Sequence, residues 1–381
     1  MKSLFILGAS EIQVPVIREC KRLGHRAVVA DYNADAPGMR IADVSLAIST
    51  NDISAILAAA QQYAIDGILT TSDYPVRTVA RVCRELGLHG LPEDAATIST
   101  DKYLQRELLR SNGFCCPRFF RIAQPEALSL VPAHVPFPMI IKPVDSSASR
   151  GVSRVDDLSR LDAAYTLARS FSRNGSVIAE EFVSGREFSV EVLIQNSRVE
   201  IIAITEKSTG GDGYLFFVEE QHIVPASVTE IEANAIRDTV RRAVIAAGLN
   251  DCASHTEVKL SSSGPVIIEI AARLGGDFIT SDLVPLATGV SMLENVLRIA
   301  LGEEIKTRQQ WSRFAGIRFV TPETHERAKS HFELICNDPR VCGLEMHEKP
   351  DGATLRSSLD RLGHCIAVGN TRQELLAILE F

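Results

Sequence analysis

The sequence predicts a protein of several domains in which α/β and α+β architecture are combined. Three observations support this prediction. The 381 residues exceed the size of one ordinary hydrophobic core. Near the N-terminus, short apolar runs alternate with amphipathic stretches, which is the pattern of βαβ units around a parallel sheet. Further along, prolines separate shorter segments, and neighbouring strand patterns follow one another directly, as in antiparallel sheets.

We expect residues 1–112 to form an open, Rossmann-like α/β domain. Strands are predicted at 4–7, 27–30 and 67–71, and helices at 12–23, 53–63 and 76–86. The turn Gly8-Ala9-Ser10 leads into the first helix, and Asp31 follows the second strand, as at a dinucleotide site. Only one of the three glycines that such a site requires is present. We therefore favour a tight turn between strand and helix over a dinucleotide site.

The pattern divides the rest of the chain into two lobes and a C-terminal region. In the small lobe, residues 113–185, strands at 139–142 and 177–180 flank a helix near 158–171. The large lobe, residues 186–308, has predicted strands at 187–194, 199–205, 256–260 and 265–270 and helices at 228–247 and 283–301. Residues 309–381 mix short apolar runs with glycines, which indicates a small α+β cap.

Composition excludes several classes of protein. The net charge is -8, and Lys and Arg are scattered among Asp and Glu, which argues against nucleic acid as a partner. No apolar window approaches the length of about 18 residues that a membrane span needs. The first residues contain no leader cleavage site, and the eight cysteines form no C-x-x-C pair, so we expect a soluble, cytoplasmic protein. A homodimer is one open alternative for the oligomeric state.

Two glutamates on neighbouring predicted strands are the most informative residues. A hairpin centred on Ser263 places Leu260 opposite Val266, and counting outwards then places Glu257 opposite Glu269. Two carboxylates about 5 Å apart on one face destabilise each other unless a cation lies between them, and Mg²⁺ is a suitable hard cation. A register shifted by one residue would instead turn the two carboxylates apart into solvent.

The turn that follows this hairpin contains further candidates. Arg273 can clamp a transferring phosphoryl group beside a metal site, although a surface ion pair is the alternative. Gly275 and Gly276 allow a ligand to approach the backbone closely. Asp277 can hold a substrate amine, or it can cap the next helix.

A second candidate site is the small-residue loop 145–151, which follows a predicted strand ending at Lys142. Backbone N–H groups and hydroxyls of such a loop, Ser149 and Gly151 included, can surround phosphates, and Lys142 can neutralise their charge. The alternative is an ordinary loop without a ligand.

The acidic segment Glu180-Glu181-Phe182-Val183 ends the next predicted strand and is followed by Gly185 and Glu187. Two roles are open to it. The charges are either exposed at a sheet edge, or the carboxylates and the backbone contact an adenine and a ribose.

Taken in order, these features resemble the ATP-grasp superfamily. The ordered motifs are Asp101-Lys102-Tyr103 at a helix start, Ile141-Lys142-Pro143, the loop ending at Gly151, the segment 180–187, Glu257, and Glu269-x-x-x-Arg273. No single motif is specific, but the ordered set is, and it is strongest between Asp101 and Gly289. The resemblance implies the ATP-grasp fold, with an N-terminal open α/β domain and a small C-terminal α+β region.

The resemblance also implies a role for each residue. Lys102 and Lys142 would bind ATP phosphates, Glu180 and the backbone of Glu181 and Val183 the adenine, Glu187 the ribose, Glu257 with Glu269 the Mg²⁺ ions, and Arg273 the acyl phosphate. Mn²⁺ could replace Mg²⁺. Lys142 and Arg273 would thus be the catalytic residues.

Within the superfamily, segments 149–152, 220–226 and 273–277 are similar to the L-amino acid ligases that form dipeptides. The similarity implies that Lys207, the loop 209–213, His222 and the Gly275-Gly276-Asp277 turn line the substrate site. A hydrogen-bonded structural role is the alternative for His222. One position departs from the family pattern, because Ala271 stands where the family has Asn. The departure implies weaker binding of one Mg²⁺, a water in place of the side chain, or loss of activity.

The reaction that this resemblance implies is ADP-forming ligation of a small-molecule carboxylate to an amine through an acyl phosphate. ATP and Mg²⁺ would be the cofactors, and at least one substrate would be an amino acid. Two alternatives remain. The first is an ATP- and bicarbonate-dependent carboxylase, which the Gly-Gly-Asp turn disfavours. The second is a nucleotide-binding protein without turnover, for which Ala271 is the hint.

Overall fold

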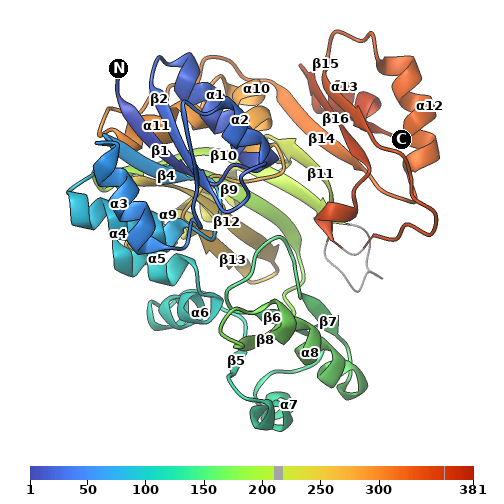
Figure 1. Cartoon of the computed structure of the whole chain (residues 1–381). Coiled ribbons are helices and arrows are strands. Elements are labelled where there is room, and N and C mark those ends of the chain that lie inside the picture. The colour runs from blue at the N-terminus through green and yellow to red at the C-terminus, as the bar shows by residue number, and fades with distance from the viewer. Residues whose placement is uncertain (210–217, 356) are drawn as a thin grey trace.

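Three β-sheets organise the computed structural model, which describes residues 1–209, 218–355 and 357–381 (Figure 1). An N-terminal sheet and a middle sheet have four strands each, and a third sheet has eight. The N-terminal sheet is parallel, and the other two are antiparallel. The predicted combination of α/β and α+β architecture is therefore confirmed.

The N-terminal sheet has the strand order β3-β2-β1-β4. Its strands are β1 (Ser3–Leu7), β2 (Arg26–Asp31), β3 (Val44–Ala47) and β4 (Gly67–Thr70), and the helices around it are η1 (Glu11–Gln13), α1 (Val14–Arg22), α2 (Pro37–Ile41), α3 (Ile53–Gln62), α4 (Val76–Leu86) and α5 (Glu93–Ser99). The sequence pattern did not predict β3, α2 and α5, which are short. The Asp31 carboxylate accepts the backbone N–H groups of Ala9 at 2.8 Å and Asn33 at 2.9 Å, so it stabilises the tight turn after β1.

The small lobe is an antiparallel sheet of order β5-β8-β6-β7 with its own core. Its strands are β5 (Phe119–Ile122), β6 (Met139–Pro143), β7 (Ser153–Val155) and β8 (Val177–Glu181), and its helices are η2 (Pro125–Leu130), α7 (Val131–His134), η3 (Leu158–Arg160) and α8 (Leu161–Phe171). Met139, Val177 and Ala168 are buried in this core, which packs α8 against the sheet. The sheet therefore holds the loop after β6 and the end of β8 close together.

The large sheet runs in the order β13-β12-β9-β10-β11-β14-β16-β15. Its strands are β9 (Arg186–Gln195), β10 (Arg198–Thr209), β11 (Glu219–Val224), β12 (Cys252–Ser261), β13 (Gly264–Ala271), β14 (Phe314–Val320), β15 (Val341–Met346) and β16 (Gly363–Gly369), and the helices α6 (Lys102–Ser111), α9 (Glu230–Ala246), α12 (His325–Ile335), η5 (Ser358–Asp360) and α13 (Arg372–Leu379) pack around it. The strands of the C-terminal region thus continue the sheet of the large lobe, and the predicted boundary at residue 308 stays a prediction.

The single helix predicted over 283–301 is wrong. The chain forms η4 (Ile279–Leu283), α10 (Val284–Thr288) and, after a break, α11 (Met292–Ala300). Gly289 ends α10 with a φ of +78°, and the Ser291 side chain caps α11 by accepting the N–H of Glu294. None of the described helices can cross a membrane singly; the two segments 279–288 and 292–300 pass only as a pair bent by 114°.

The hairpin of β12 and β13 confirms the predicted pairing of Glu257 with Glu269 and corrects the predicted pairing of Leu260. Leu260 pairs with Pro265 and not with Val266, because the connecting loop is only two residues long. An extra residue in β13, Ile268, then shifts the register by one, so that Glu257 does pair with Glu269. The two glutamates therefore face each other because of a β-bulge, which the sequence pattern did not reveal.

Packing between the sheets places the functional segments around one space. One hydrophobic core contains Leu4 of β1, Leu193 of β9 and Ile317 of β14, so the N-terminal domain and the large sheet share buried side chains. Figure 1 shows the small lobe lying apart from this body, with α6 beside it. The loops after β1, β4 and β6 and the strands β10 to β13 surround the cavity described next.

Candidate active site

A cavity of about 530 Å³ lies between the N-terminal domain, the small lobe and the large sheet. Most side chains predicted for the site line it: Lys102, Lys142, Ser149, Glu180, Glu181, Val183, Glu187, Lys207, His222, Glu257, Glu269, Arg273, Gly276 and Asp277. Among the described residues, Gly151 and Gly275 are not part of this lining. Gly210–Gly213 of the loop predicted to border the substrate lie outside the described residues.

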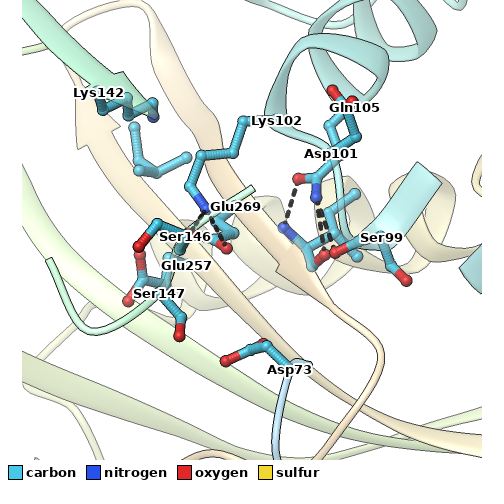
Figure 2. A network of polar contacts seen from close by, with 12 residues as sticks. Asp73, Ser99, Asp101, Lys102, Gln105, Lys142, Ser146, Ser147, Glu257 and Glu269 are labelled. Atoms are coloured by element: carbon cyan, nitrogen blue, oxygen red, sulfur yellow. Dashed lines mark hydrogen bonds and ion pairs between the residues drawn. The ribbon is translucent and has the colours of Figure 1, made fainter. Parts of the chain in front are cut away.

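The two facing glutamates each have a lysine partner. Lys207 donates to Glu257 Oε1 at 2.6 Å, and Lys102 donates to Glu269 Oε1 at 2.9 Å. Figure 2 shows Lys102 reaching from α6 to both Glu269 and the Ser146 carbonyl, which accepts at 2.7 Å. The expected positive charge beside the two carboxylates is therefore present, because two buried ammonium groups compensate their charge, and the Mg²⁺ site stays a prediction.

Helix α6 fixes the bulge that makes these glutamates face each other. Gln105 accepts the N–H of Ile270 at 2.8 Å and donates to its carbonyl at 3.1 Å. Arg106 donates to the carbonyls of Ile267 at 3.0 Å and Ile268 at 2.8 Å, on either side of the bulged residue. Sequence reasoning missed both side chains. Their helical spacing from Lys102, three and four residues, was the available signal.

Arg106 also joins a buried cluster with Glu180 and Lys142. Its guanidinium donates to both Glu180 oxygens, at 2.9 and 3.1 Å, and the Lys142 ammonium lies 2.8 Å from Glu180 Oε2. Burial would raise the pKa of Glu180, but Arg106 and Lys142 lower it to about 2. Burial lowers the pKa of Lys142 despite the opposing effect of Glu180. The Glu180 carboxylate is thus committed to two cations, and its predicted contact with adenine stays a prediction.

Lys207 is the most heavily paired cation of the site. Its ammonium lies 2.6 Å from Glu257, 3.0 Å from Glu219 and 3.4 Å from Glu187. Burial would lower the pKa of Lys207, but the three carboxylates raise it well above its usual value. Lys207 therefore remains charged at neutral pH and connects Glu187 with Glu257.

The small-residue loop after β6 borders the cavity through Ser146, Ser147, Ala148 and Ser149. The buried Ser146 hydroxyl has no hydrogen-bond partner in the described part of the chain, so it is available to a ligand. Gly151 packs against α8 and does not line the cavity in the described structure, so its contact with phosphate stays a prediction. Arg150 donates to the Tyr74 hydroxyl of the N-terminal domain, which connects the loop to that domain.

Arg273 forms a bidentate ion pair with Asp73, which follows β4 of the N-terminal domain. The distances are 2.7 and 2.9 Å, and the Arg273 side chain is only 16% exposed. The alternative of a surface ion pair is therefore wrong. Burial would lower the pKa of Arg273, but Asp73 raises it by more than burial lowers it. The guanidinium therefore keeps its charge beside Glu269.

The Gly275-Gly276 pair divides into two roles. A Cβ on Gly275 would lie 2.6 Å from His255 Nδ1 and 2.9 Å from a Glu191 oxygen. The close approach at Gly275 in this structure is thus to the protein's own side chains, and its contact with a ligand stays a prediction. His255 and Glu191 form a buried pair at 2.7 Å that raises the pKa of His255 to about 9 against the effect of burial. Gly276 borders the cavity with open space around it.

Asp277 and His222 meet on the wall nearest the C-terminal region. Asp277 does not cap the following helix, since no side-chain hydrogen bond closes the start of η4. Its Oδ2 lies 3.0 Å from Arg361 and 3.6 Å from His222 Nε2. Within the described residues, neither ring nitrogen of the buried His222 has a hydrogen-bond partner. The described residues thus supply no hydrogen bond of the length that a structural histidine would have, and the role of His222 in the substrate site stays a prediction.

Ala271 lines the cavity and pairs with His255 across the hairpin. Its methyl group offers no oxygen to a cation, so Glu257 and Glu269 are the carboxylates that the hairpin presents to the cavity in the described structure. Sequence reasoning also missed Asp73, Glu219 and Arg361, which hold Arg273, Lys207 and Asp277 respectively. No local pattern marks these residues, since each acts on a partner distant in the chain.

Comparisons with known proteins agree with this geometry. A model of the ATP-grasp domain matches residues 135–282. The uncharacterized protein y4rH of Sinorhizobium fredii is 25% identical over 345 residues, which cover 87% of this chain and 71% of that protein. Alanine–anticapsin ligase of Bacillus subtilis is 26% identical over 247 residues, 59% of this chain, and the match spans about half, 52%, of the ligase.

A solved structure extends the likeness over the whole fold. The L-amino acid ligase from Bacillus licheniformis superposes with a TM-score of 0.81 and 22% identity, covering 100% of this chain and 96% of that one. The chain therefore has the ATP-grasp fold, carries an ATP-grasp domain over residues 135–282, and resembles the amino acid ligases of this superfamily.

Proposed function

We propose that the chain is an ADP-forming carboxylate-amine ligase with an amino acid as at least one substrate. One observation carries the proposal: the facing carboxylates Glu257 and Glu269 share a cavity with the cations Lys102, Lys142 and Arg273. Such a set of fixed charges suits phosphoryl transfer, which depends on positioning and charge neutralisation more than on covalent help. The names of the relatives support the same class of reaction.

The residues present fit a divalent cation with oxygen ligands. Glu257 and Glu269 supply hard carboxylate oxygens, and Mg²⁺ usually takes one or two carboxylates and completes its shell with phosphate oxygens and water. When bound there, Mg²⁺ would neutralise phosphate charge, and Mn²⁺ could take its place. Because Ala271 contributes no ligand, we expect weaker binding than at a site with a third side chain.

The chain's own groups would act in two stages. In the first, the substrate carboxylate takes the γ-phosphoryl group of ATP and ADP leaves, while Lys102, Lys142 and the Ser146 hydroxyl hold the phosphate oxygens. In the second, the neutral amine attacks the carbonyl carbon, the bond to the phosphate oxygen breaks, and phosphate leaves and takes up the proton that the nitrogen loses. Arg273, kept in place by Asp73, would hold the phosphate oxygens of this leaving group.

The amine is assigned to the wall that carries Asp277. A carboxylate that borders the cavity and is 35% exposed can pair with an ammonium group. A site built to bind an ammonium discriminates against analogues that lack it, because the Asp277 oxygen that faces the ligand would then lose its charged partner. We therefore assign the α-amino group of an amino acid to this position.

The test is ADP release by the purified chain with ATP and Mg²⁺. The twenty common amino acids are added singly and in pairs, and bicarbonate is added alone in a separate series. We expect release to rise with at least one amino acid or pair, together with formation of an amide. Stimulation by bicarbonate alone would support a carboxylase instead. ATP binding without release under any condition would support a nucleotide-binding protein without turnover.

A further inference from the structure

The turn that carries Asp277 has an unusual backbone. Asp277 and the next residue, Phe278, both lie in the left-handed region, with φ of +51° and +61°. Residues other than glycine rarely adopt this conformation, and for a bulky residue such as phenylalanine it is an outlier. Two such residues in succession persist only where the surrounding structure holds them. Outliers of this kind concentrate where a side chain must be presented to a ligand.

Two contacts from the C-terminal region hold this turn. The Arg361 guanidinium lies 3.0 Å from Asp277 Oδ2, and the His364 ring packs against the Phe278 ring with centroids 4.4 Å apart. Arg361 follows η5, and His364 lies in β16, so both belong to the C-terminal region. The backbone of the turn is therefore held by residues more than eighty positions further along the chain.

Arg361 itself is held firmly. Its side chain is 7% exposed, its guanidinium stacks 3.7 Å over the Phe319 ring, and its second amino group lies 3.1 Å from Glu219 Oε2. In the described structure, Arg361 is not part of the cavity lining, whereas Asp277 is. An effect of Arg361 on a ligand would thus pass through the side chain that it holds.

Arg361 contacts two carboxylates, Glu219 and Asp277, and they differ in how many of their oxygens already have a partner. Glu219 uses one oxygen for Lys207, at 3.0 Å, and the other for Arg361. Asp277 contacts Arg361 and His222 through Oδ2 only, and its Oδ1 has no recorded partner among the described residues. Burial would raise the pKa of Asp277, but His222 and Arg361 lower it below its usual value. Asp277 is therefore an ionised carboxylate whose Oδ1 has no partner among residues 1–209, 218–355 and 357–381.

We propose that Arg361 is a positioning residue of the substrate site: it holds one Asp277 oxygen so that the other accepts the α-ammonium group of an amino acid substrate. The inference rests on the proposed function and deepens it, because it places the selection of the amine in a contact between the C-terminal region and the Gly276-Asp277 turn. Arg361 touches neither the reacting atoms nor the nucleotide. Its loss should weaken binding of the amino acid and leave binding of ATP nearly unchanged.

The experiment compares Arg361→Met, Arg361→Lys and the control Arg340→Met in steady-state ADP release. Arg340 is an exposed arginine of the same region that pairs with Asp338. The probe is whichever common amino acid stimulates the wild type most. We expect Arg361→Met to raise the KM for this amino acid about tenfold or more, as for a lost charge-assisted contact, and to change the KM for ATP less than twofold. Arg361→Lys should recover most of the loss, and Arg340→Met should behave as wild type.

A double-mutant cycle with Asp277→Asn separates positioning from general destabilisation. If Arg361 acts through Asp277, adding Arg361→Met to Asp277→Asn should change the amino acid KM by less than twofold. Additive effects, an unchanged amino acid KM in Arg361→Met, or equal losses for ATP and amino acid would each overturn the inference and leave the proposed function standing. A wild type that responds to no amino acid would overturn both. Arg361→Lys retains a cation and supplies the comparison if Arg361→Met does not fold.

Discussion

Two walls of the cavity are built in different ways. The lysine wall consists of Lys102, Lys142, Glu180 and Glu269, with the buried Arg106 behind it. Every cation of this set has a carboxylate partner at 2.8 to 3.1 Å. The histidine wall consists of His222 and Asp277, with Arg361 behind Asp277. His222 lies 3.6 Å from Asp277 and has no hydrogen bond within the described residues. The charged groups of the lysine wall therefore all have partners without a ligand. At the histidine wall, the His222 ring nitrogens have no hydrogen-bond partner among the described residues.

The difference indicates what each wall is built to bind. Paired charges fixed by a helix and a β-bulge keep one geometry, which suits a ligand that does not vary, such as the phosphates of ATP. Unpaired polar atoms and a left-handed turn reduce stability, and they persist where a ligand supplies the missing contacts. Substitutions should therefore differ in their effect on stability: loss of Arg106 or Glu269 at the lysine wall should destabilise the fold, whereas loss of His222 at the histidine wall should not.

The largest effect is expected on activity at the lysine wall. Lys142→Met should lower ADP release by about 100-fold or more, because the phosphates lose a preorganised cation. The thermal midpoint should change little, since burial already lowers the pKa of Lys142 and its charge is costly in the fold. Lys329→Met, at an exposed position of α12, is the control. Normal turnover by Lys142→Met would refute the assignment of the loop after β6 to phosphates.

The largest effect on stability is expected at Arg106. Arg106→Met leaves the buried Glu180 with Lys142 as its one cation and leaves the carbonyls of Ile267 and Ile268 without this donor. We therefore expect a loss of about 3–5 kcal/mol in the free energy of unfolding. Urea unfolding measures it, and Arg110→Met, an exposed arginine of the same helix, is the matched control. A loss below about 1 kcal/mol, the range of a surface pair, would contradict the central place of this cluster.

The pH dependence of stability tests the same cluster. The pKa of Glu180 is about 2 in the folded chain, below its ordinary value of 4.5. A depressed pKa stabilises the fold above pH 4.5, and this contribution is lost as the pH falls towards 2. The contribution is on the order of 3 kcal/mol. Wild type and Glu180→Gln should therefore differ in unfolding free energy at pH 7 and converge as the pH falls below 4.5. Parallel curves would show that Glu180 does not titrate as proposed.

A smaller effect is expected where a metal ion would join the lysine wall. Glu269→Gln should raise the Mg²⁺ concentration needed for half-maximal ADP release by about tenfold, or about 1.4 kcal/mol. Repulsion between Glu257 and Glu269 alone would make the metal-free variant more stable. Because Glu269 pairs with Lys102, we expect it to be slightly less stable. Glu348→Gln, at an exposed site, is the control, and an unchanged Mg²⁺ requirement would remove Glu269 from the metal site.

The smallest effect on stability is expected at the histidine wall. His222→Phe keeps an aromatic ring edge-on to Phe319 and removes two unpaired nitrogens, so the unfolding free energy should stay equal or rise by up to about 1 kcal/mol. Stimulation of ADP release by an amino acid should nevertheless fall. His331→Phe is the contrasting control, because His331 hydrogen-bonds the Ile378 carbonyl at 2.7 Å and its replacement should destabilise. Destabilisation by His222→Phe would show that the two walls do not differ in this way.

Local sequence patterns predicted most of the elements that carry the lysine wall. The apolar run that ends at Lys142 became β6, and Asp101 caps α6 with two backbone hydrogen bonds, as the motif at 101–103 indicated. These features depend on neighbours in the chain, so periodicity and residue type reveal them. The helix predicted over 283–301 failed because apolar periodicity continues through Gly289, while the backbone does not.

The sequence by itself determined the order of the chemical groups along the chain: the lysines, the acidic strand end, the two glutamates and the arginine that follows them. Only the tertiary structure decided their partners. The register of Glu257 against Glu269 depends on a bulge that Arg106 holds from another helix. The setting of Asp277 depends on Arg361 from the C-terminal region. Such contacts join residues far apart in the chain, and their strength depends on burial and distance, which arise only when the sheets pack together.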